Sequence, residues 1–322
     1  MNILITGVAG FIGSNLADVL SLQSKYQIIG IDNFDGNYCR KIKEQNIRGL
    51  LSKSNFKFVE ADVCSEKSME DIFSDNSIDT VIHLAAKVGV RPSMEAPLEY
   101  IETNVKGTAV ILEAMRRNNV SKMIFASSSS IYGANTKVPF SESDSTENII
   151  SVYAATKLAA EQLNKLYHDV YGFSIINLRF FTVYGERQRP DLAIHKFFSD
   201  IMNGKSITIY GAGDTSRDYT YVGDIVSGIS SAIEYINKND NVFEITNLGN
   251  NKPVNILELV KKIELITGVQ ANILYKPLPS GDVIKTYADI SKAKMLLSYF
   301  PKVNIDEGLT HFYKSYIQNK AN

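Results

Sequence analysis

Three glycines near the start of the chain restrict its fold more than any other feature. Gly7, Gly10 and Gly13 follow the apolar segment 3–5 and precede a helical pattern, which gives G-x-x-G-x-x-G at a strand-to-helix junction. Glycines in this place allow a tight turn and let backbone N–H groups approach a pyrophosphate at the start of the helix. In other settings a glycine-rich stretch is only a linker or a bend. Its place between a strand and a helix predicts a dinucleotide-binding turn.

An acidic residue ends the next expected strand, residues 27–31. Asp32 follows Gly13 by 19 residues, close to the spacing expected of a carboxylate that binds the adenosine ribose. The alternative is a solvated acid in a loop. A carboxylate here repels a 2′-phosphate, and the neighbouring Asn33 adds no positive charge, so the sequence favours NAD over NADP.

Strands and helical segments alternate through the first half of the chain. Further strands are expected at residues 56–63, 80–86, 123–126 and 175–178. This alternation predicts an α/β fold with a parallel, doubly wound sheet. Ligands of such sheets bind at the carboxyl ends of the strands, where the candidate residues lie. His83, inside the fourth strand, is expected to be a packed core histidine rather than a catalytic one.

A serine-rich strand end and a later helix supply the candidate catalytic groups. Ser128 follows the apolar run 123–126, and the helical pattern 151–171 contains Tyr153 and Lys157. Residues four apart share a helix face, so the tyrosine and the lysine can both face the serine. A nearby ammonium and a cationic cofactor would lower the tyrosine pKa from its ordinary value of about 10. Such a phenol can take a proton from a substrate hydroxyl and return it.

The Tyr-x-x-x-Lys pattern occurs twice, so the pattern alone does not identify a catalytic pair. The second copy, Tyr316 with Lys320, lies near the C-terminus, where chains tend to fray. No serine-bearing apolar strand precedes it, so we interpret it as chance.

Composition and charge narrow the class of partner. The 34 Lys and Arg and 35 Asp and Glu residues leave a formal net charge of -1, so a small molecule is favoured over nucleic acid or a membrane surface. Cys39 and Cys64 form no metal-spaced cluster and fit a reduced, cytoplasmic protein without a metal. No apolar run reaches the roughly 18 residues of a membrane span. The first strand begins at once, so no leader is expected.

A second long helical pattern runs from about residue 97 to residue 118. We expect it to pack beside the 151–171 helix, with Ile101, Val105, Leu112 and Met115 on a shared apolar face. An intramolecular core is the default interpretation, and a dimer-forming helix bundle is the alternative.

The alternation loosens after residue 178. Polar, aromatic and charged residues gather at 179–191, 207–222 and 276–288, and such side chains suit a nucleotide diphosphate and its base. Pro277, Pro279 and Gly281 make the last stretch a loop. For any single residue in these stretches, a plain surface role is the alternative.

With the glycine turn, Ser128 and Tyr153-x-x-x-Lys157 in one chain, the sequence resembles the extended short-chain dehydrogenase/reductase superfamily. More narrowly, it resembles the nucleotide-sugar 4-epimerases, from residue 1 to about residue 316. The resemblance implies a Rossmann-type NAD-binding domain at 1–178, to which part of 215–248 returns. It implies a smaller C-terminal α/β domain, mainly 179–322, that binds a UDP-sugar. It also implies a homodimer formed by two long helices of each subunit.

The resemblance assigns roles to individual residues. Tyr153 is the acid/base, Lys157 holds the nicotinamide ribose, and Ser128 hydrogen-bonds the sugar 4-hydroxyl. The residues expected to contact NAD are Gly7, Gly10, Phe11, Ile12, Gly13, Asp32, Asn33, Asp62, Val63, Leu84, Ala85, Ala86, Lys87, Asn104, Tyr153, Lys157 and Phe180. Those expected on the substrate side are Ser128, Ser129, Arg91, Thr182, Arg189, Lys196, Tyr210, Arg217 and Asp282.

Departures from neighbouring families narrow the implied reaction. The 4,6-dehydratases carry an Asp-Glu pair where this chain has Ser129 and Ser130, and UDP-glucuronate decarboxylases carry Glu at the second of these positions. Thr182, residues 189–191 and residues 281–289 together resemble the UDP-glucuronate 4-epimerases. Arg189 would then form a fork with the C6 carboxylate. Residues 186–188 differ from the sequence that is usual at these positions in enzymes acting on UDP-uronates.

The implied activity is therefore C4 epimerisation of a UDP-sugar through a 4-keto intermediate, with UDP-glucuronate converted to UDP-galacturonate. A UDP-glucose or UDP-N-acetylglucosamine 4-epimerase is the alternative within enzymes. A reductase is less favoured, because many reductases use NADPH and Asp32 opposes it. An NAD-sensing regulator could share the fold, but a sensor has no need of Ser128, Tyr153 and Lys157.

Overall fold

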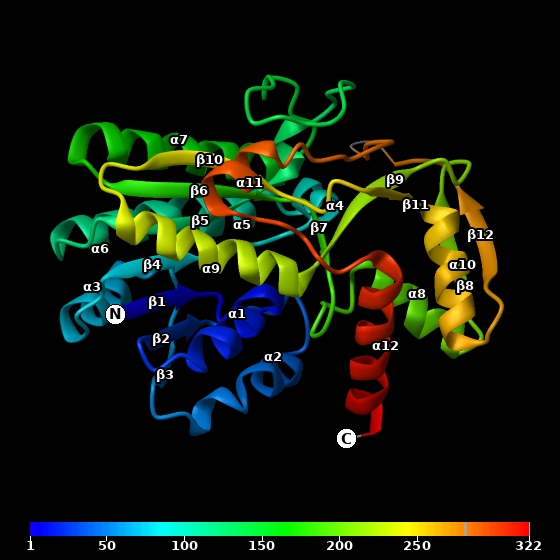
Figure 1. Ribbon diagram of the computed structural model, residues 1–322, viewed down its shortest axis with the longest axis horizontal. Helices are drawn as coiled ribbons and strands as arrows, with labels where there is room; N and C mark the ends of the chain where they lie inside the picture. Colours follow the sequence, from blue (N-terminus) through cyan, green and yellow to red (C-terminus); the bar gives the residue numbers. More distant parts are fainter. Residues whose placement is uncertain (280–281, 322) are drawn as a thin grey trace.

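A seven-stranded parallel sheet forms the centre of the protein (Figure 1). The computed structural model describes residues 1–279 and 282–321, with side chains to residue 318, so Gly281 of the expected loop lies outside the described residues. The strand order is β10-β6-β5-β4-β1-β2-β3, and all neighbours in it are parallel. The strands are β1 (Asn2–Thr6), β2 (Gln27–Asp32), β3 (Phe56–Glu60), β4 (Thr80–His83), β5 (Lys122–Ser128), β6 (Ser174–Phe180) and β10 (Phe243–Leu248).

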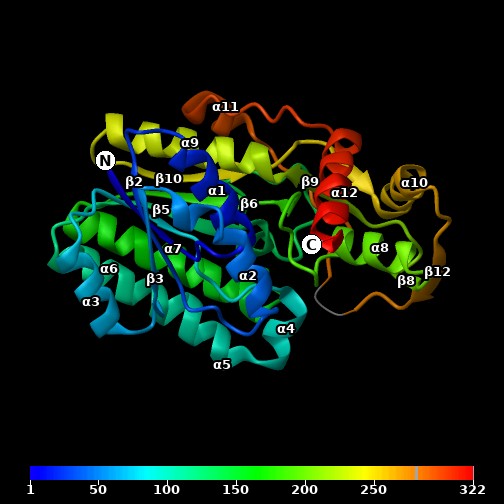
Figure 2. The same cartoon turned by 90° about the horizontal axis from the view of Figure 1, so that it is seen from below.

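Helices cover both faces of this sheet (Figure 2). Successive residues of a strand point to opposite faces, and here both sets are apolar: Leu4 packs in one core, and Ile3 and Ile5 in the other. One layer holds α1 (Phe11–Ser21), α9 (Val222–Lys238) and α11 (Ser291–Leu297). The other holds α3 (Glu66–Asp75), α6 (Gly107–Arg117) and α7 (Val152–Tyr171). The predicted doubly wound α/β fold is therefore confirmed.

Two of the expected strands end earlier than the sequence pattern indicates. The strand expected at 80–86 stops at His83. The Leu84 N–H is shared between the Thr6 carbonyl and the Thr6 hydroxyl, and the Ala85 N–H donates to that hydroxyl alone. The strand expected at 56–63 stops at Glu60, and Asp62 folds a turn by accepting the Cys64 N–H at 2.8 Å. Both early stops leave loop backbone at the carboxyl edge of the sheet.

The helix expected at 97–118 forms with an irregular middle. It consists of α5 (Pro97–Tyr100), a π-helical turn η2 (Ile101–Lys106) and α6, and it contacts α7 as expected. Leu112 and Met115 are fully buried, but Ile101 is 47% exposed, so the default interpretation of an intramolecular core is wrong for that residue. The π turn rotates the helix between the two ends, and such turns are frequent at functional sites.

The chain leaves the central sheet after β6 and builds a smaller unit, at the right of Figure 1. Its core joins α8 (Ala193–Met202), α10 (Ile256–Thr267) and α12 (Ile305–Ala321) with short strands. The short strands are β7 (Thr182–Tyr184), β8 (Ser206–Tyr210), β9 (Ser216–Tyr221), β11 (Pro253–Asn255) and β12 (Asn272–Lys276). Between these segments the chain returns to the large sheet twice, first through α9 and β10 and then through α11.

Five shorter helical segments lie in the connections. They are α2 (Arg40–Ile47), η1 (Leu50–Ser52), α4 (Val90–Glu95), α5 and η3 (Ser129–Tyr132). In the part of the chain that the structure describes, none of the helices has the length and apolar character needed to cross a bilayer.

Candidate active site

A cavity of about 510 Å³ opens at the carboxyl edge of the central sheet. Its walls come from the ends of β1, β2, β4, β5 and β6 together with β7, the start of α7 and the 282–286 loop. The cavity gathers most of the sequence-predicted residues, although they come from segments up to 275 residues apart, between Gly7 and Asp282. This is the place where ligands of doubly wound sheets bind.

The glycine turn forms one end of the cavity. Gly7 has φ +71°, and a Cβ on it would lie 2.8 Å from the Ala85 nitrogen; a Cβ on Gly13 would lie 2.3 Å from the Gly7 oxygen. The N-cap of α1 is Gly10, which provides no side-chain hydrogen bond to the first turn. The N-terminus of α1 thus presents backbone N–H groups beside a wall without side chains, and this arrangement fits the pyrophosphate of a dinucleotide.

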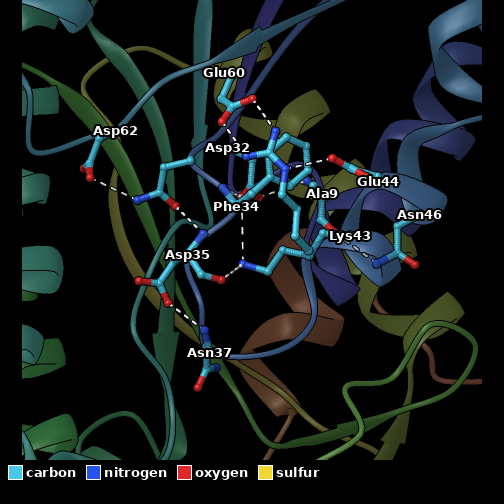
Figure 3. A network of polar contacts seen from close by, with 12 residues as sticks. Ala9, Asp32, Phe34, Asp35, Asn37, Lys43, Glu44, Asn46, Glu60 and Asp62 are labelled. Carbon is cyan, nitrogen blue, oxygen red and sulfur yellow. Dashed lines mark hydrogen bonds and ion pairs between the residues drawn. The ribbon is translucent and has the colours of Figure 1, made fainter.

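Asp32 lies at the end of β2 in the same wall (Figure 3). Its carboxylate accepts hydrogen bonds from the N–H groups of Ala9 at 3.1 Å and Phe34 at 2.8 Å. Burial raises the pKa of Asp32, while Lys43 and these two N–H groups act against that rise. Asn33 also lines the cavity, and its amide donates to Asp62 at 3.0 Å. Asp62 itself is not among the lining residues.

The turn after β4 supplies the opposite wall through Leu84, Ala85, Ala86 and Lys87. Asn104, on the π turn, is buried behind this wall and does not line the cavity. Its side chain accepts from the Lys87 N–H at 2.8 Å and donates to the Lys87 carbonyl at 2.9 Å. Asn104 therefore holds the wall in place from the π turn.

Ser128, Tyr153 and Lys157 all line the cavity, and the Tyr153 hydroxyl interacts with the Ser128 side chain. The Ser128 hydroxyl accepts the Ser130 N–H at 3.1 Å, and the Lys157 ammonium donates to the Ala126 carbonyl at 2.8 Å. α7 begins at this point because the Ser151 hydroxyl caps it, accepting the Ala154 N–H at 3.1 Å. The helix therefore projects Tyr153 and Lys157 from its first two turns toward the end of β5.

The expected lowering of the tyrosine pKa is not found in the protein alone. Burial raises the pKa of Tyr153, and the opposing effects of Ser128 and Arg189 are smaller. Burial also lowers the pKa of Lys157 to about 7. The sequence argument placed the ammonium beside the phenol, whereas the Lys157 ammonium donates to the Ala126 carbonyl of β5. The positive charge of a bound nicotinamide would lower the pKa of Tyr153, because it stabilises the phenolate.

Besides Ser128, five of the residues expected on the substrate side line the same cavity. They are Ser129, Thr182, Arg189, Arg217 and Asp282. The Arg189 guanidinium forms a fork with Asp191, at 3.0 Å from Nε and 2.6 Å from Nη2. The Asp191 carboxylate thus competes with a substrate carboxylate for the two hydrogen bonds that the Arg189 guanidinium was predicted to donate. A substrate carboxylate would have to displace or share this partner.

Three substrate-side candidates lie outside the cavity wall. Arg91 donates to Asp282 at 2.5 Å, and its guanidinium stacks 4.2 Å from the ring of Tyr210, so both support the wall from behind. Lys196, on α8, is exposed and does not line the cavity. The sequence match gave no information on which face of α8 this lysine would occupy.

The cavity also contains residues that sequence reasoning missed. Tyr38 and Lys43, from the segment after β2, line the cavity near Asp32, and Thr286 and Phe140 line it on the substrate side. Thr286 lies in the 281–289 stretch that resembles the UDP-glucuronate 4-epimerases, but no role was assigned to it. The other three belong to no motif, and only their place after a cofactor-binding strand could have drawn attention to Tyr38 and Lys43. His83 is buried between the hydroxyls of Thr6 and Thr108, as expected of a core histidine, and burial lowers its pKa to about 3.

The fold and the site define a class of protein. A model of the NAD dependent epimerase/dehydratase family matches residues 3–249, and the chain belongs to this family. The resemblance inferred from the sequence is thereby confirmed.

Within the family, the similar proteins include several sugar-nucleotide epimerases. The chain is 40% identical to a UDP-glucuronate 4-epimerase of Thermodesulfobacterium geofontis, over 95% of this chain and 93% of that protein. It is 43% identical to an uncharacterised protein of Methanocaldococcus jannaschii, over 99% and 97% of the two chains. The crystal structure of UDP-glucuronic acid 4-epimerase from Bacillus cereus, in complex with UDP-glucuronic acid and NAD, superposes with a TM-score of 0.93 at 37% identity, covering 99% of this chain and 100% of that one. The crystal structure of UDP-glucose 4-epimerase from Thermotoga maritima with UDP-glucose superposes with a TM-score of 0.88 at 34% identity. The match covers 99% of this chain and 100% of that one.

Proposed function

We propose that this protein is an NAD-dependent UDP-sugar 4-epimerase that interconverts UDP-glucuronate and UDP-galacturonate. The observation that carries the proposal is one cavity whose lining includes Ser128, Tyr153 and Lys157, a dinucleotide-type glycine turn, and Thr182 and Arg189. The similarity to UDP-glucuronate 4-epimerases over nearly the whole chain supports the same reaction and substrate.

NAD, when bound, supplies a hydride acceptor that can return the hydride to the opposite face of C4. The glycine turn and Asp32 would hold its pyrophosphate and adenosine ribose. Tyr153 acts as the phenolate, which the positive charge of bound NAD would favour. The phenolate takes the proton of the sugar 4-hydroxyl and gives it back after the 4-keto sugar has turned about its link to the diphosphate. Ser128 hydrogen-bonds the 4-oxygen, and Lys157 holds the nicotinamide ribose. Arg217 and Asp282 hold the uridine diphosphate part while the sugar turns.

A uronate substrate carries a chemical hazard, because its 4-keto form is a β-keto acid that can lose carbon dioxide. Decarboxylation requires the C5–C6 bond to lie parallel to the carbonyl π system. In the proposed reaction Thr182 and Arg189 hold the carboxylate so that this bond stays near the carbonyl plane. Asp191 holds the Arg189 guanidinium in place before the substrate arrives.

Arg189→Ala tests this assignment. We expect the variant either to lose affinity for UDP-glucuronate, by about tenfold or more for a charge-assisted bond, or to release some UDP-pentose. Chromatography of the products and a Michaelis–Menten titration measure the two effects. Normal turnover of UDP-glucuronate with no pentose would contradict the assignment.

The substrate is tested by incubating the pure protein separately with UDP-glucuronate, UDP-glucose and UDP-N-acetylglucosamine. We expect chromatography to show a new 4-epimer from UDP-glucuronate with no added reductant. A 4-epimer from one of the other two sugars alone would overturn the uronate assignment and keep the reaction class. No change in any of the three would favour a nucleotide-sensing role.

We further propose a homodimer through the faces of α5, η2 and α7 that the monomer leaves uncovered. Large apolar side chains are exposed there: Leu98 by 77%, Ile101 by 47%, Leu166 by 52% and Val170 by 60%. An exposed apolar surface on adjacent helices is typical of an interface. Sedimentation should give twice the mass of one chain, and Leu98→Glu with Val170→Glu should give a monomer. A monomeric wild-type protein would refute the dimer.

Domain division and location complete the proposal. Residues 1–178, with part of 215–248, form the NAD-binding unit, and the remainder mainly forms the UDP-sugar unit. The return of β10 to the large sheet supports this division. The free thiols of Cys39 and Cys64 suit a reducing compartment such as the cytoplasm.

A further inference from the structure

A buried lysine faces the acid expected to bind the adenosine ribose (Figure 3). Lys43, on α2, is 7% exposed and lines the cavity together with Asp32. Its Nζ lies 4.0 Å from Asp32 Oδ1 and donates to the Asp35 carbonyl at 2.9 Å. Burying an ammonium is costly unless it is paired, and no step of the proposed reaction uses this one.

Lys43 is also held in a fixed position. One helical turn further along α2, the side-chain amide of Asn46 donates to the Ala9 carbonyl at 3.0 Å, and the Ala9 N–H in turn donates to Asp32. α2 is therefore tied to the glycine turn and, through it, to the acid. The backbone of α2 is thus held close to Asp32, and the bond to the Asp35 carbonyl holds the Lys43 ammonium at the end of its side chain.

The separation of 4.0 Å is too long for a direct hydrogen bond, whose usual range ends at about 3.2 Å. An oxygen placed about 2.8 Å from both atoms would see them at an angle of about 90°, which a hydroxyl group can satisfy. The ammonium has only donors, and the carboxylate has only acceptors. A hydroxyl can accept a hydrogen bond from Lys43 and donate one to Asp32, so a single hydroxyl gives each of the two side chains a further hydrogen-bond partner.

The neighbouring Tyr38 supports the presence of a ligand at this wall. Its hydroxyl is buried and has no hydrogen-bond partner among the described residues, and its ring lies 4.9 Å from the Lys43 Nζ. A buried unsatisfied hydroxyl that lines a cavity indicates a group still to be bound. The lysine and the tyrosine thus form one polar wall beside Asp32.

We propose that Lys43 is a cofactor-binding residue that donates a hydrogen bond to an adenosine-ribose hydroxyl of NAD, while Asp32 accepts from the same hydroxyl. The inference rests on the proposed function, because it assigns the ligand at this wall to that cofactor. A 2′-phosphate is not accommodated by this lysine, since the ammonium is already balanced by a carboxylate that repels the phosphate. Lys43 thereby strengthens the retention of NAD without admitting NADP.

The test compares NAD with its two analogues that lack the adenosine 2′-hydroxyl or 3′-hydroxyl. Calorimetry on nucleotide-free protein measures each affinity in the wild type, in Lys43→Met and in Lys43→Arg. We expect the wild type to bind one of the analogues at least tenfold more weakly than NAD. Lys43→Met should bind NAD at least tenfold more weakly and should no longer distinguish that analogue from NAD, and Lys43→Arg should recover part of the difference.

Lys41→Met is the matched control, because Lys41 is an exposed lysine on the same helix; it should bind all three nucleotides as the wild type does. Equal binding of NAD and both analogues by the wild type would overturn the inference, even if Lys43→Met did not fold. Unchanged NAD affinity in a folded Lys43→Met would also overturn it. A wild type that binds no NAD would instead refute the proposed function, and this inference with it.

Discussion

Tyr153→Phe is expected to lower the rate of 4-epimerisation by about 10²–10⁴-fold, the usual contribution of a positioned acid/base group. The substitution removes one hydroxyl and leaves the ring, which packs edge-on against Tyr100 with centroids 6.3 Å apart. The backbone N–H of Tyr153 also keeps its bond to the Ser93 hydroxyl at 3.0 Å. The fold and the affinity for NAD should therefore change little, and the loss should lie in kcat.

Tyr316→Phe is the matched control for this prediction. Tyr316 opens the second Tyr-x-x-x-Lys of the chain, but it lies on α12 against His195 and Phe312 and does not line the catalytic cavity. The epimerase activity of the Tyr316→Phe variant should equal that of the wild type. Steady-state rates with UDP-glucuronate and bound-nucleotide content after purification give the comparison. A Tyr153→Phe enzyme within a few-fold of wild-type kcat would exclude the phenol as the acid/base.

The same pair of tyrosines shows why a sequence pattern predicts some parts of a site well. Spacing along one helix places Tyr153 and Lys157 on one face, and the apolar run of β5 places Ser128 at a strand end. These relations are local, so they follow from the period of the element. The glycine turn is equally local, since a tight strand-to-helix junction constrains residues within one turn.

Other features of the site depend on contacts that no local pattern encodes. The pKa of Tyr153 is set by burial from several segments, and the position of Lys43 near Asp32 depends on the way α2 packs on the glycine turn. Lys196 was placed by a match of motifs, but the solvent side of α8 is decided by the packing of the smaller core. Long-range packing is the part that sequence reasoning could not supply.

A buried ion pair behind the catalytic groups gives the second large expected effect. Glu161, eight residues after Tyr153 on α7, accepts two hydrogen bonds from Arg179 of β6, at 3.0 and 2.8 Å, and the two side chains are 1% and 3% exposed. Arg179 also donates to the Tyr132 hydroxyl at 3.1 Å, and the Ser127 hydroxyl donates to Glu161 at 2.5 Å. The network therefore ties α7 to β5 and β6, next to the strand end that carries Ser128.

Glu161→Gln is expected to lower the free energy of unfolding by about 3–5 kcal/mol, because it leaves the Arg179 guanidinium buried without a counter-charge. Denaturant unfolding measures the change. The exposed pair of Lys165 and Asp169 on the same helix is the matched control, and Lys165→Met should change the stability by less than about 1 kcal/mol.

Combining Glu161→Gln with Arg179→Met distinguishes an unpaired charge from a loss of packing. If the cost of the single variants comes from the charge left behind, the double variant should be more stable than the sum of the two single effects predicts. Strictly additive losses, or a Glu161→Gln protein as stable as the wild type, would show that the pair does not hold α7 in place. Because α7 carries Tyr153 and Lys157, a loosened helix should also lower kcat in the single variants, and the double variant should recover kcat together with stability.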